Sequence, residues 1–312
     1  MAFDAPATLT PRPLGSTAIS ISPLTLGASS LGRDHTRPAR SMATARAMIT
    51  SAGMATDTSN NYAGGHSETL LGQAIAENGG LEPGHILITK ADADPSTQAF
   101  DRDRVWRSFE ESKARLGLDR IPLLHLHDPY SVTVEAAFAR HGAVQGMIEL
   151  REQGLVDAIG IAAGPLSLMT RYVTSGIFDA LLTHNRYTLI DRRAEPLISE
   201  AAQRGMGVFN AAPFGGGILA GQPGTRYAYR ESPKPLLQWV TRLTDLCNRW
   251  EIPLAAAALH FSVRNPCIDS TVVGVSSPER IAELQHLQHL TVPEAFWTTL
   301  SELGTPPSTL ND

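Results

Sequence analysis

The chain has 312 residues, of which 42% are hydrophobic and 18% are charged, as expected for a globular protein with a substantial core. Its formal net charge of −5 offers no electrostatic footprint for nucleic acid or for an anionic membrane surface. The two cysteines, Cys247 and Cys267, have no cysteine or histidine neighbours at zinc-ligand spacing. The sequence therefore predicts neither a disulfide framework nor a metal site.

The amino-terminal segment contains Pro6, Pro11 and Pro13 and no apolar run, which predicts that there is no secretory signal. No stretch of the chain approaches about 18 consecutive apolar residues, so we expect no membrane span. These two absences favour a cytoplasmic location.

Residues 14–22 alternate between apolar and polar side chains, which predicts a small two-stranded hairpin. Apolar runs of strand length then alternate with segments of helical length. The pattern predicts strands over residues 24–27, 54–57, 86–90, 123–127, 158–162, 180–184, 208–211 and 271–275. It predicts helices over residues 102–116, 134–153, 193–204 and 236–249, with two more over 278–288 and 293–303 after the last strand.

The predicted strands are continuously apolar, which is typical of parallel strands buried on both faces. Their alternation with helices predicts one α/β domain over residues 1–312, a (β/α)8 TIM barrel with an N-terminal β-hairpin and extra C-terminal helices. A doubly wound open sheet is the alternative, but no Gly-x-Gly-x-x-Gly motif follows an early strand. The long loop over residues 213–232 is typical of a lid or a ligand clamp.

Three consecutive predicted strands end in ionisable side chains, namely Asp57, Lys90 and His127. In a barrel the carboxyl ends of all strands face one shared mouth, and Tyr62 lies on the loop that follows Asp57. A single strand-end lysine or histidine is usually structural, but three in succession beside a tyrosine indicate a common site. His125 is on the same strand face as His127, one layer deeper in the barrel.

These residue types form a coherent acid–base set. A phenol has a pKa of about 10, and an ammonium about 4 Å away stabilises the phenolate by up to about 4 kcal/mol. We therefore expect Lys90 to lower the pKa of Tyr62 by roughly three units, into the working range. Asp57 would keep Lys90 charged, and His127 could donate a hydrogen bond to a carbonyl oxygen. Such a site moves a proton without a metal, so a hydride must come from a cofactor.

Four motifs resemble those of the aldo-keto reductases: Asp57-Thr-Ser-x-x-Tyr62, Gly65-x-Ser67-Glu68-x-x-Leu71-Gly72, Ile88-Thr89-Lys90 and Leu126-His127-Asp128-Pro129. The resemblance implies a barrel that binds NADP or NAD at its mouth, with Asp57, Tyr62, Lys90 and His127 as the catalytic tetrad. It also selects His127 over His125, because the catalytic histidine of the family precedes x-Pro.

The resemblance further implies cofactor contacts from four segments. They are Gly27, Ala28 and Ser29; His184; Pro213, Phe214, Gly215, Gly216, Ile218 and Leu219; and Gly274, Val275, Ser276 and Arg280. Glycines in the third segment would let backbone N–H groups approach a pyrophosphate closely.

The nicotinamide and adenosine positions depart from the family pattern. Ala162-Ala163 replaces a Ser-Asn pair, and Ala211 replaces the tyrosine that stacks on the nicotinamide ring. Val275 and Ser276 stand where many relatives have a basic residue for a 2′-phosphate, which leaves Arg280 as a phosphate partner. Both NAD and NADP therefore stay open.

Residues 184–191 and 212–220 look most like the branch of L-fucose, D-threo-aldose and pyridoxal dehydrogenases. This likeness implies NAD(P)-dependent interconversion of a hydroxyl and a carbonyl, such as oxidation of the anomeric hydroxyl of an aldose or a similar ring hydroxyl, or reduction of an aldehyde or ketone. Tyr62 would be the proton donor and acceptor, and the partner would be a small molecule. Two alternatives remain: a Schiff-base aldolase with Lys90 as nucleophile, and a non-catalytic regulatory barrel that binds the nicotinamide cofactor.

Overall fold

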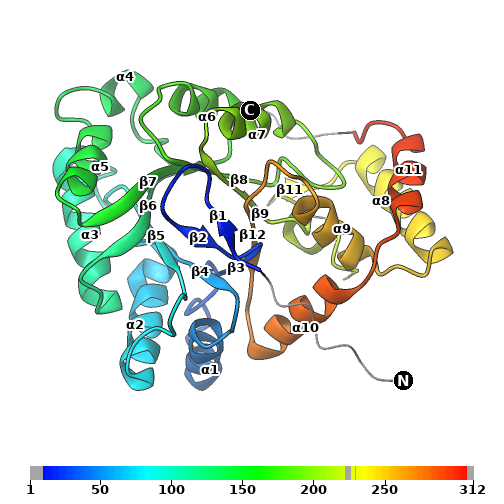
Figure 1. Ribbon diagram of the computed structural model, residues 1–312, viewed down its shortest axis with the longest axis horizontal. Helices are drawn as coiled ribbons and strands as arrows, with labels where there is room; N and C mark the ends of the chain where they lie inside the picture. Colours follow the sequence, from blue (N-terminus) through cyan, green and yellow to red (C-terminus); the bar gives the residue numbers. More distant parts are fainter. Residues whose placement is uncertain (1–9, 222–225, 229, 308–312) are drawn as a thin grey trace.

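Eight parallel strands close into a barrel, as predicted (Figure 1). The computed structural model describes residues 10–221, 226–228 and 230–307, so Pro6 and positions 222–225 and 229 of the predicted long loop lie outside the described residues. In hydrogen-bonding order the strands are β12 (Ser270–Gly274), β3 (Leu24–Gly27), β4 (Ala55–Asp57), β5 (Leu87–Ala91), β6 (Ile121–His127), β7 (Val156–Ala163), β8 (Ala180–His184) and β9 (Gly207–Ala211).

Helices surround the barrel and cover its outer face (Figure 1). They are α1 (Pro38–Ile49), α2 (His66–Asn78), α3 (Arg102–Leu116), α4 (Val134–Ala137), α5 (Ala143–Glu152), α6 (Leu166–Val173), α7 (Glu195–Gln203), α8 (Lys234–Arg249), α9 (Leu254–Val263), α10 (Pro278–His289) and α11 (Glu294–Glu302). The extra helices after the last strand are thereby confirmed. The long loop after β9 holds the short turn η2 (Gly215–Gly217) and a small hairpin, β10 (Arg226–Tyr227) with β11 (Arg230–Glu231).

The prediction of one helix over residues 134–153 is wrong, because the segment forms two helices, α4 and α5. The chain turns between them at Gly142, where a Cβ would lie 2.2 Å from the carbonyl oxygen of Ala136. Only glycine permits so close an approach of two backbone segments.

The predicted amino-terminal hairpin, β1 (Arg12–Pro13) with β2 (Ser20–Ile21), closes one end of the barrel. Figure 1 shows it in dark blue across the ring of strands. Leu14 and Ile21 are fully buried in the cluster of side chains that fills the barrel interior, together with Ala55, Ile88, Leu123, Ala158, Ala180, Leu182, Phe209 and Val272. Because this plug occupies the amino ends of the strands, the carboxyl ends form the open mouth.

Candidate active site

The four predicted tetrad residues meet at the mouth of the barrel. Lys90 Nζ donates hydrogen bonds to Asp57 Oδ2 at 2.7 Å and to Tyr62 Oη at 3.2 Å. The rings of Tyr62 and His127 lie edge to face with their centroids 5.7 Å apart. All four side chains line one cavity of about 480 Å³. The structure thus brings together the residues that the strand ends and the motifs had singled out.

Lys90 and Asp57 form an ion pair inside the protein, with only 1% and 4% of their surfaces exposed. Burial raises the pKa of Asp57, because desolvation outweighs the attraction of Lys90. Burial alone would lower the pKa of Lys90, but the charges of Asp57 and Tyr62 and the hydrogen bonds to both raise it above its ordinary value. Lys90 also donates to the carbonyl oxygen of Thr58 at 2.5 Å, so the ammonium is held in place as a charged group.

The predicted lowering of the Tyr62 pKa is wrong for this site. Burial is the largest effect on the phenol and disfavours its charged form, and it outweighs the stabilisation by Lys90, so the pKa of Tyr62 rises to about 12. The negative charge of Asp57 adds to the rise. Burial therefore favours the protonated form of the phenol.

His127 has a partner that the sequence analysis missed. Its Nδ1 atom lies 2.7 Å from Asp92 Oδ1 and 3.1 Å from Ser59 Oγ. Ser59 also donates to Asp92 Oδ2, and the backbone N–H of Asn61 donates to the same oxygen at 3.0 Å. Burial alone would lower the pKa of His127, but the charge of Asp92 and its hydrogen bond raise it.

His125 lies one layer deeper, as predicted, and is fully buried. Neither ring nitrogen has a hydrogen-bond partner among the described residues, and the ring packs edge to face on Phe209 at 5.7 Å. A Cβ at Gly160 would lie 2.2 Å from His125 Nδ1, so glycine leaves the space for the ring. Burial lowers the pKa of His125 well below its usual range, which keeps the imidazole neutral. His125 is not among the residues that line the cavity at the mouth.

A polar network fastens the loop that carries Tyr62 to α3. Arg104 Nη2 donates to Asn60 Oδ1 at 3.0 Å, and Arg115 Nη1 donates to the Asn60 carbonyl oxygen at 2.9 Å. Arg115 also pairs with the fully buried Glu68 at 3.1 Å. The loop beyond Asn60 passes through Ala63 at φ 52° before α2 begins. Because both arginines hold this loop, the position of Tyr62 is fixed by the scaffold.

The predicted cofactor residues divide into two groups. Gly27, Ser29, His184 and Gly274 line the same cavity as the tetrad. The rest lie outside it: Ala28 and Val275 are fully buried beside it, Ser276 lines a neighbouring cavity, and Pro213, Phe214, Gly215, Gly216, Ile218 and Leu219 form the η2 segment and its flanks. Arg280 stacks on the Phe214 ring at 5.0 Å and thereby connects the third and the fourth of the predicted cofactor segments.

The cavity also has lining residues that the sequence analysis did not assign to the site, among them Ser30, Arg33, Asp128, Asn185 and Ala212. His184 Nδ1 lies 3.1 Å from Asn185 Nδ2, and burial lowers the pKa of His184 to about 4. Ala162 and Ala211, which stand where the family has larger side chains, also line this cavity. The mouth is therefore wider where those side chains would stand.

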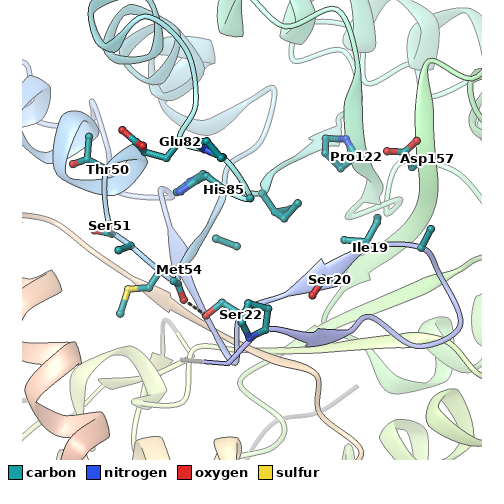
Figure 2. A pocket seen from close by; sticks show the side chains of 18 residues that line it. Ile19, Ser20, Ser22, Thr50, Ser51, Met54, Glu82, His85, Pro122 and Asp157 are labelled. Atoms are coloured by element: carbon teal, nitrogen blue, oxygen red, sulfur yellow. Dashed lines mark hydrogen bonds between the residues drawn. The ribbon is translucent and has the colours of Figure 1, made fainter. Parts of the chain in front are cut away.

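A larger cavity of about 650 Å³ lies at the opposite, amino end of the strands. Figure 2 shows its walls, with Ile19 and Ser20 of the hairpin facing Met54 and His85. His85 Nε2 is hydrogen-bonded to Thr56 Oγ1 at 3.0 Å, and burial lowers the pKa of His85 to about 4. This end of a barrel serves stability, and the cavity holds no set of coupled acid–base groups like the one at the mouth.

We expect the buried neutral His85 to make the protein acid-sensitive. Its pKa is about 4 in the folded state and about 6.5 when unfolded, so the unfolded chain binds more protons between these values. The free energy of unfolding should fall by up to about 3 kcal/mol from this residue as the pH drops from about 6.5 to about 4.

The test is urea unfolding across that pH range. In His85→Gln, which keeps a polar partner for Thr56, the fall should be shallower than in the wild type. His125 and His184, whose pKa values are also lowered, account for a remaining slope. Equal slopes in the two proteins would contradict the assignment.

Comparison with known proteins identifies the family of this chain. The sequence model of the Aldo/keto reductase family matches residues 23–304. Pyridoxal 4-dehydrogenase from Microbacterium luteolum is 33% identical over 66% of this chain and 63% of its own length. D-threo-aldose 1-dehydrogenase from a Pseudomonas species is 30% identical over 81% of this chain and 84% of its own.

A solved structure with a similar fold comes from the same family. The holo form of aldo-keto reductase AKR11C1 from Bacillus halodurans superposes with a TM-score of 0.78 over 95% of this chain and 96% of its own, at 20% identity. Among the described residues, no helix is long and apolar enough to cross a membrane. The chain belongs to the aldo/keto reductase family of NAD(P)-dependent oxidoreductases.

Proposed function

We propose that this protein oxidises a hydroxyl group of a small ring compound, with the anomeric hydroxyl of an aldose as the first candidate, and that the same site reduces the corresponding carbonyl. The observation that carries the proposal is the joining of Tyr62, Lys90, Asp57 and His127 in one cavity at the barrel mouth. The names of the two relatives, an aldose dehydrogenase and a pyridoxal dehydrogenase, supply the substrate class.

The mouth fits a nicotinamide cofactor. The small side chains Ala162, Ala211 and Ala212 leave room for a planar ring beside Tyr62 and His127. A Cβ at Gly274 would meet only Ser29 Oγ, at 3.9 Å, so the rim between β3 and β12 is open for a ligand. When bound there, NAD or NADP would supply the acceptor or donor of the hydride.

The chain's own contribution is to hold the reacting oxygen and its proton. In reduction Tyr62 would give its proton to that oxygen, and in oxidation it would take the proton back; burial, which raises the pKa of Tyr62 to about 12, favours the protonated donor form. Lys90 fixes the phenol through its 3.2 Å contact.

The aldolase alternative requires Lys90 to be an uncharged nucleophile. Its three hydrogen bonds, to Asp57, Thr58 and Tyr62, and its raised pKa favour the charged ammonium. The regulatory alternative requires a cofactor site without chemistry, but the whole tetrad is in place. Both observations support an oxidoreductase.

The proposal is tested by a steady-state screen of aldoses and aromatic aldehydes with NAD⁺, NADP⁺ and their reduced forms, followed at the absorbance of the reduced nicotinamide. We expect oxidation of at least one free aldose or pyridoxal-like compound. Tight cofactor binding without turnover of any compound would overturn the proposal in favour of the regulatory barrel.

A further prediction concerns Arg280 and the preference between NADPH and NADH. We expect Arg280→Met to weaken NADPH binding about tenfold, because a charge-assisted hydrogen bond to the 2′-phosphate is lost, and to leave NADH binding nearly unchanged. Fluorescence titration of the reduced cofactors gives both dissociation constants.

Arg264→Met is the matched control, because Arg264 also stacks on an aromatic ring, Trp297 at 4.6 Å, and pairs with a glutamate. It should change neither constant. An equal loss for NADH and NADPH in Arg280→Met would show that the residue does not contact the 2′-phosphate.

A further inference from the structure

We infer that Asp128 determines which substrates the site accepts, because its carboxylate takes a hydrogen bond from a hydroxyl group on the carbon next to the reacting carbon. The inference rests on the proposed function and deepens it by naming the substrate class: 2-hydroxy carbonyl compounds and the cyclic aldoses that correspond to them. Tyr62 and His127 keep their places at the reacting oxygen, and Asp128 binds the neighbouring hydroxyl.

Asp128 lies beside the ring nitrogen that faces a ligand. Both hydrogen bonds of the His127 ring within the described residues use Nδ1, so Nε2 is the nitrogen left for the reacting oxygen. Asp128 lines the same cavity, and its Oδ2 atom lies 3.7 Å from Nε2, beyond hydrogen-bond distance. A ligand oxygen at Nε2 is therefore close to the carboxylate as well, and the next substituent of that ligand can reach Oδ2.

The carboxylate of Asp128 can accept more hydrogen bonds than the protein supplies. Within residues 10–221, 226–228 and 230–307, its Oδ1 atom is buried without a hydrogen-bond partner, and neither a lysine nor an arginine forms an ion pair with it. An unpaired carboxylate oxygen costs free energy, and a ligand can supply the missing partner. Because a carboxylate only accepts hydrogen bonds, the matching ligand group is a donor such as a hydroxyl. The side chain is 39% exposed, so a ligand in the cavity can reach it.

The backbone holds Asp128 in an unusual conformation. Its φ is 43°, in the left-handed region that residues other than glycine adopt rarely. Its N–H donates to the carbonyl oxygen of Ala162 at 2.9 Å, and its own carbonyl oxygen accepts from the N–H of Tyr130 at 2.6 Å. The hydroxyl of Tyr130 accepts from the N–H of Gly164 at 3.0 Å, which ties this loop to the end of β7. The main chain therefore fixes the carboxylate at the rim before any ligand binds.

This position selects among the candidate substrates. An aldose carries a hydroxyl on the carbon bonded to its anomeric carbon, whereas a simple aromatic or aliphatic aldehyde has none. A site built to bind a substrate hydroxyl discriminates strongly against the analogue without it, because the site's own polar group is then left unpaired. The alternative is that Asp128 acts only as a negative charge beside His127, which would affect all substrates equally.

Two variants remove the carboxylate and suit the backbone of the loop. Asp128→Gly removes the side chain, and glycine adopts a positive φ without steric cost. Asp128→Asn keeps a residue that tolerates the left-handed region, and its neutral amide is a weaker acceptor than a carboxylate. Glu135→Gln is the matched control, because Glu135 is a carboxylate on α4 that pairs with Arg171 at 3.1 Å and lies outside the cavity.

The first measurement compares the reduction of lactaldehyde and propionaldehyde, which differ only in the 2-hydroxyl. In the wild type and in Glu135→Gln we expect kcat/KM to be about 10²-fold higher for one enantiomer of lactaldehyde than for propionaldehyde. In Asp128→Gly the two values should lie within about threefold, and Asp128→Asn should lose at least about tenfold of the preference. No preference in the wild type, or an equal loss for both aldehydes in the variants, would overturn the inference.

The second measurement does not depend on turnover. Lactamide and propionamide are unreactive carbonyl compounds that differ by the same hydroxyl, and NMR titration of the full-length protein with reduced cofactor present gives their dissociation constants. The wild type and Glu135→Gln should bind one enantiomer of lactamide about tenfold more tightly than propionamide, and Asp128→Gly should bind the two alike. Equal binding in the wild type, or an unchanged preference in Asp128→Gly, would overturn the inference.

Failure of this inference and failure of the proposed function give different results. If the wild type turns over no aldose and no aldehyde, the proposed function is wrong, and the amide titration alone decides the role of Asp128. If aldoses are oxidised but neither variant changes the preference for the 2-hydroxyl, the proposed function stands and the assignment of Asp128 is wrong.

Discussion

Tyr62→Phe should lower kcat by about 10³-fold or more and leave the dissociation constant of the reduced cofactor within about twofold of the wild type. In the proposed function the hydroxyl donates to the reacting oxygen, and loss of one such donor costs about 3–4 kcal/mol in the transition state. The ring itself stays, so its edge-to-face packing on His127 is kept. Single-turnover kinetics and cofactor fluorescence measure the two quantities.

Tyr172→Phe is a matched control for this change. Tyr172 is fully buried, its hydroxyl has no hydrogen-bond partner in the part of the chain that the structure describes, and its ring packs on Phe138 and Phe178. Removal of that hydroxyl should leave kcat unchanged. Wild-type activity in Tyr62→Phe, or an equal loss in both variants, would rule out a specific role for the Tyr62 hydroxyl.

The barrel and the tetrad could be predicted because each rests on a local pattern. Buried parallel strands are continuous apolar runs, and their last residues share one mouth whatever the details of packing. The same reasoning could also have identified Asp92. It continues the alternating face of Ile88 and Lys90 by one more step, but it lies just past the end of β5, where the apolar run had already stopped.

Other features depend on three-dimensional packing that no local pattern reveals. The break between α4 and α5 follows from the contact of Gly142 with Ala136, which is absent from the apolar periodicity. The sign of the Tyr62 pKa shift depends on how much water the folded site excludes, whereas the sequence shows only that a lysine is near. Desolvation and attraction act on the pKa in opposite directions, so proximity alone could not fix the sign of the shift.

The buried ion pair between Lys90 and Asp57 should have a large effect on the stability of the protein. Lys90→Met should lower the free energy of unfolding by about 3–5 kcal/mol, because it leaves the Asp57 carboxylate buried without its partner. Asp57 Oδ1 already lacks a hydrogen-bond partner within residues 10–221, 226–228 and 230–307, so little else can compensate the charge. Urea unfolding at neutral pH measures the loss.

The double variant Asp57→Asn with Lys90→Met separates stability from activity. With both charges removed, no ion is left in the interior, and the free energy of unfolding should return to within about 1–2 kcal/mol of the wild type. Activity should stay lost, since Tyr62 no longer has the ammonium 3.2 Å from its hydroxyl. The two results together would show that the pair is kept for the chemistry of the phenol and adds little to the fold. A double variant that unfolds as easily as Lys90→Met would show instead that the pair is a structural element of the barrel.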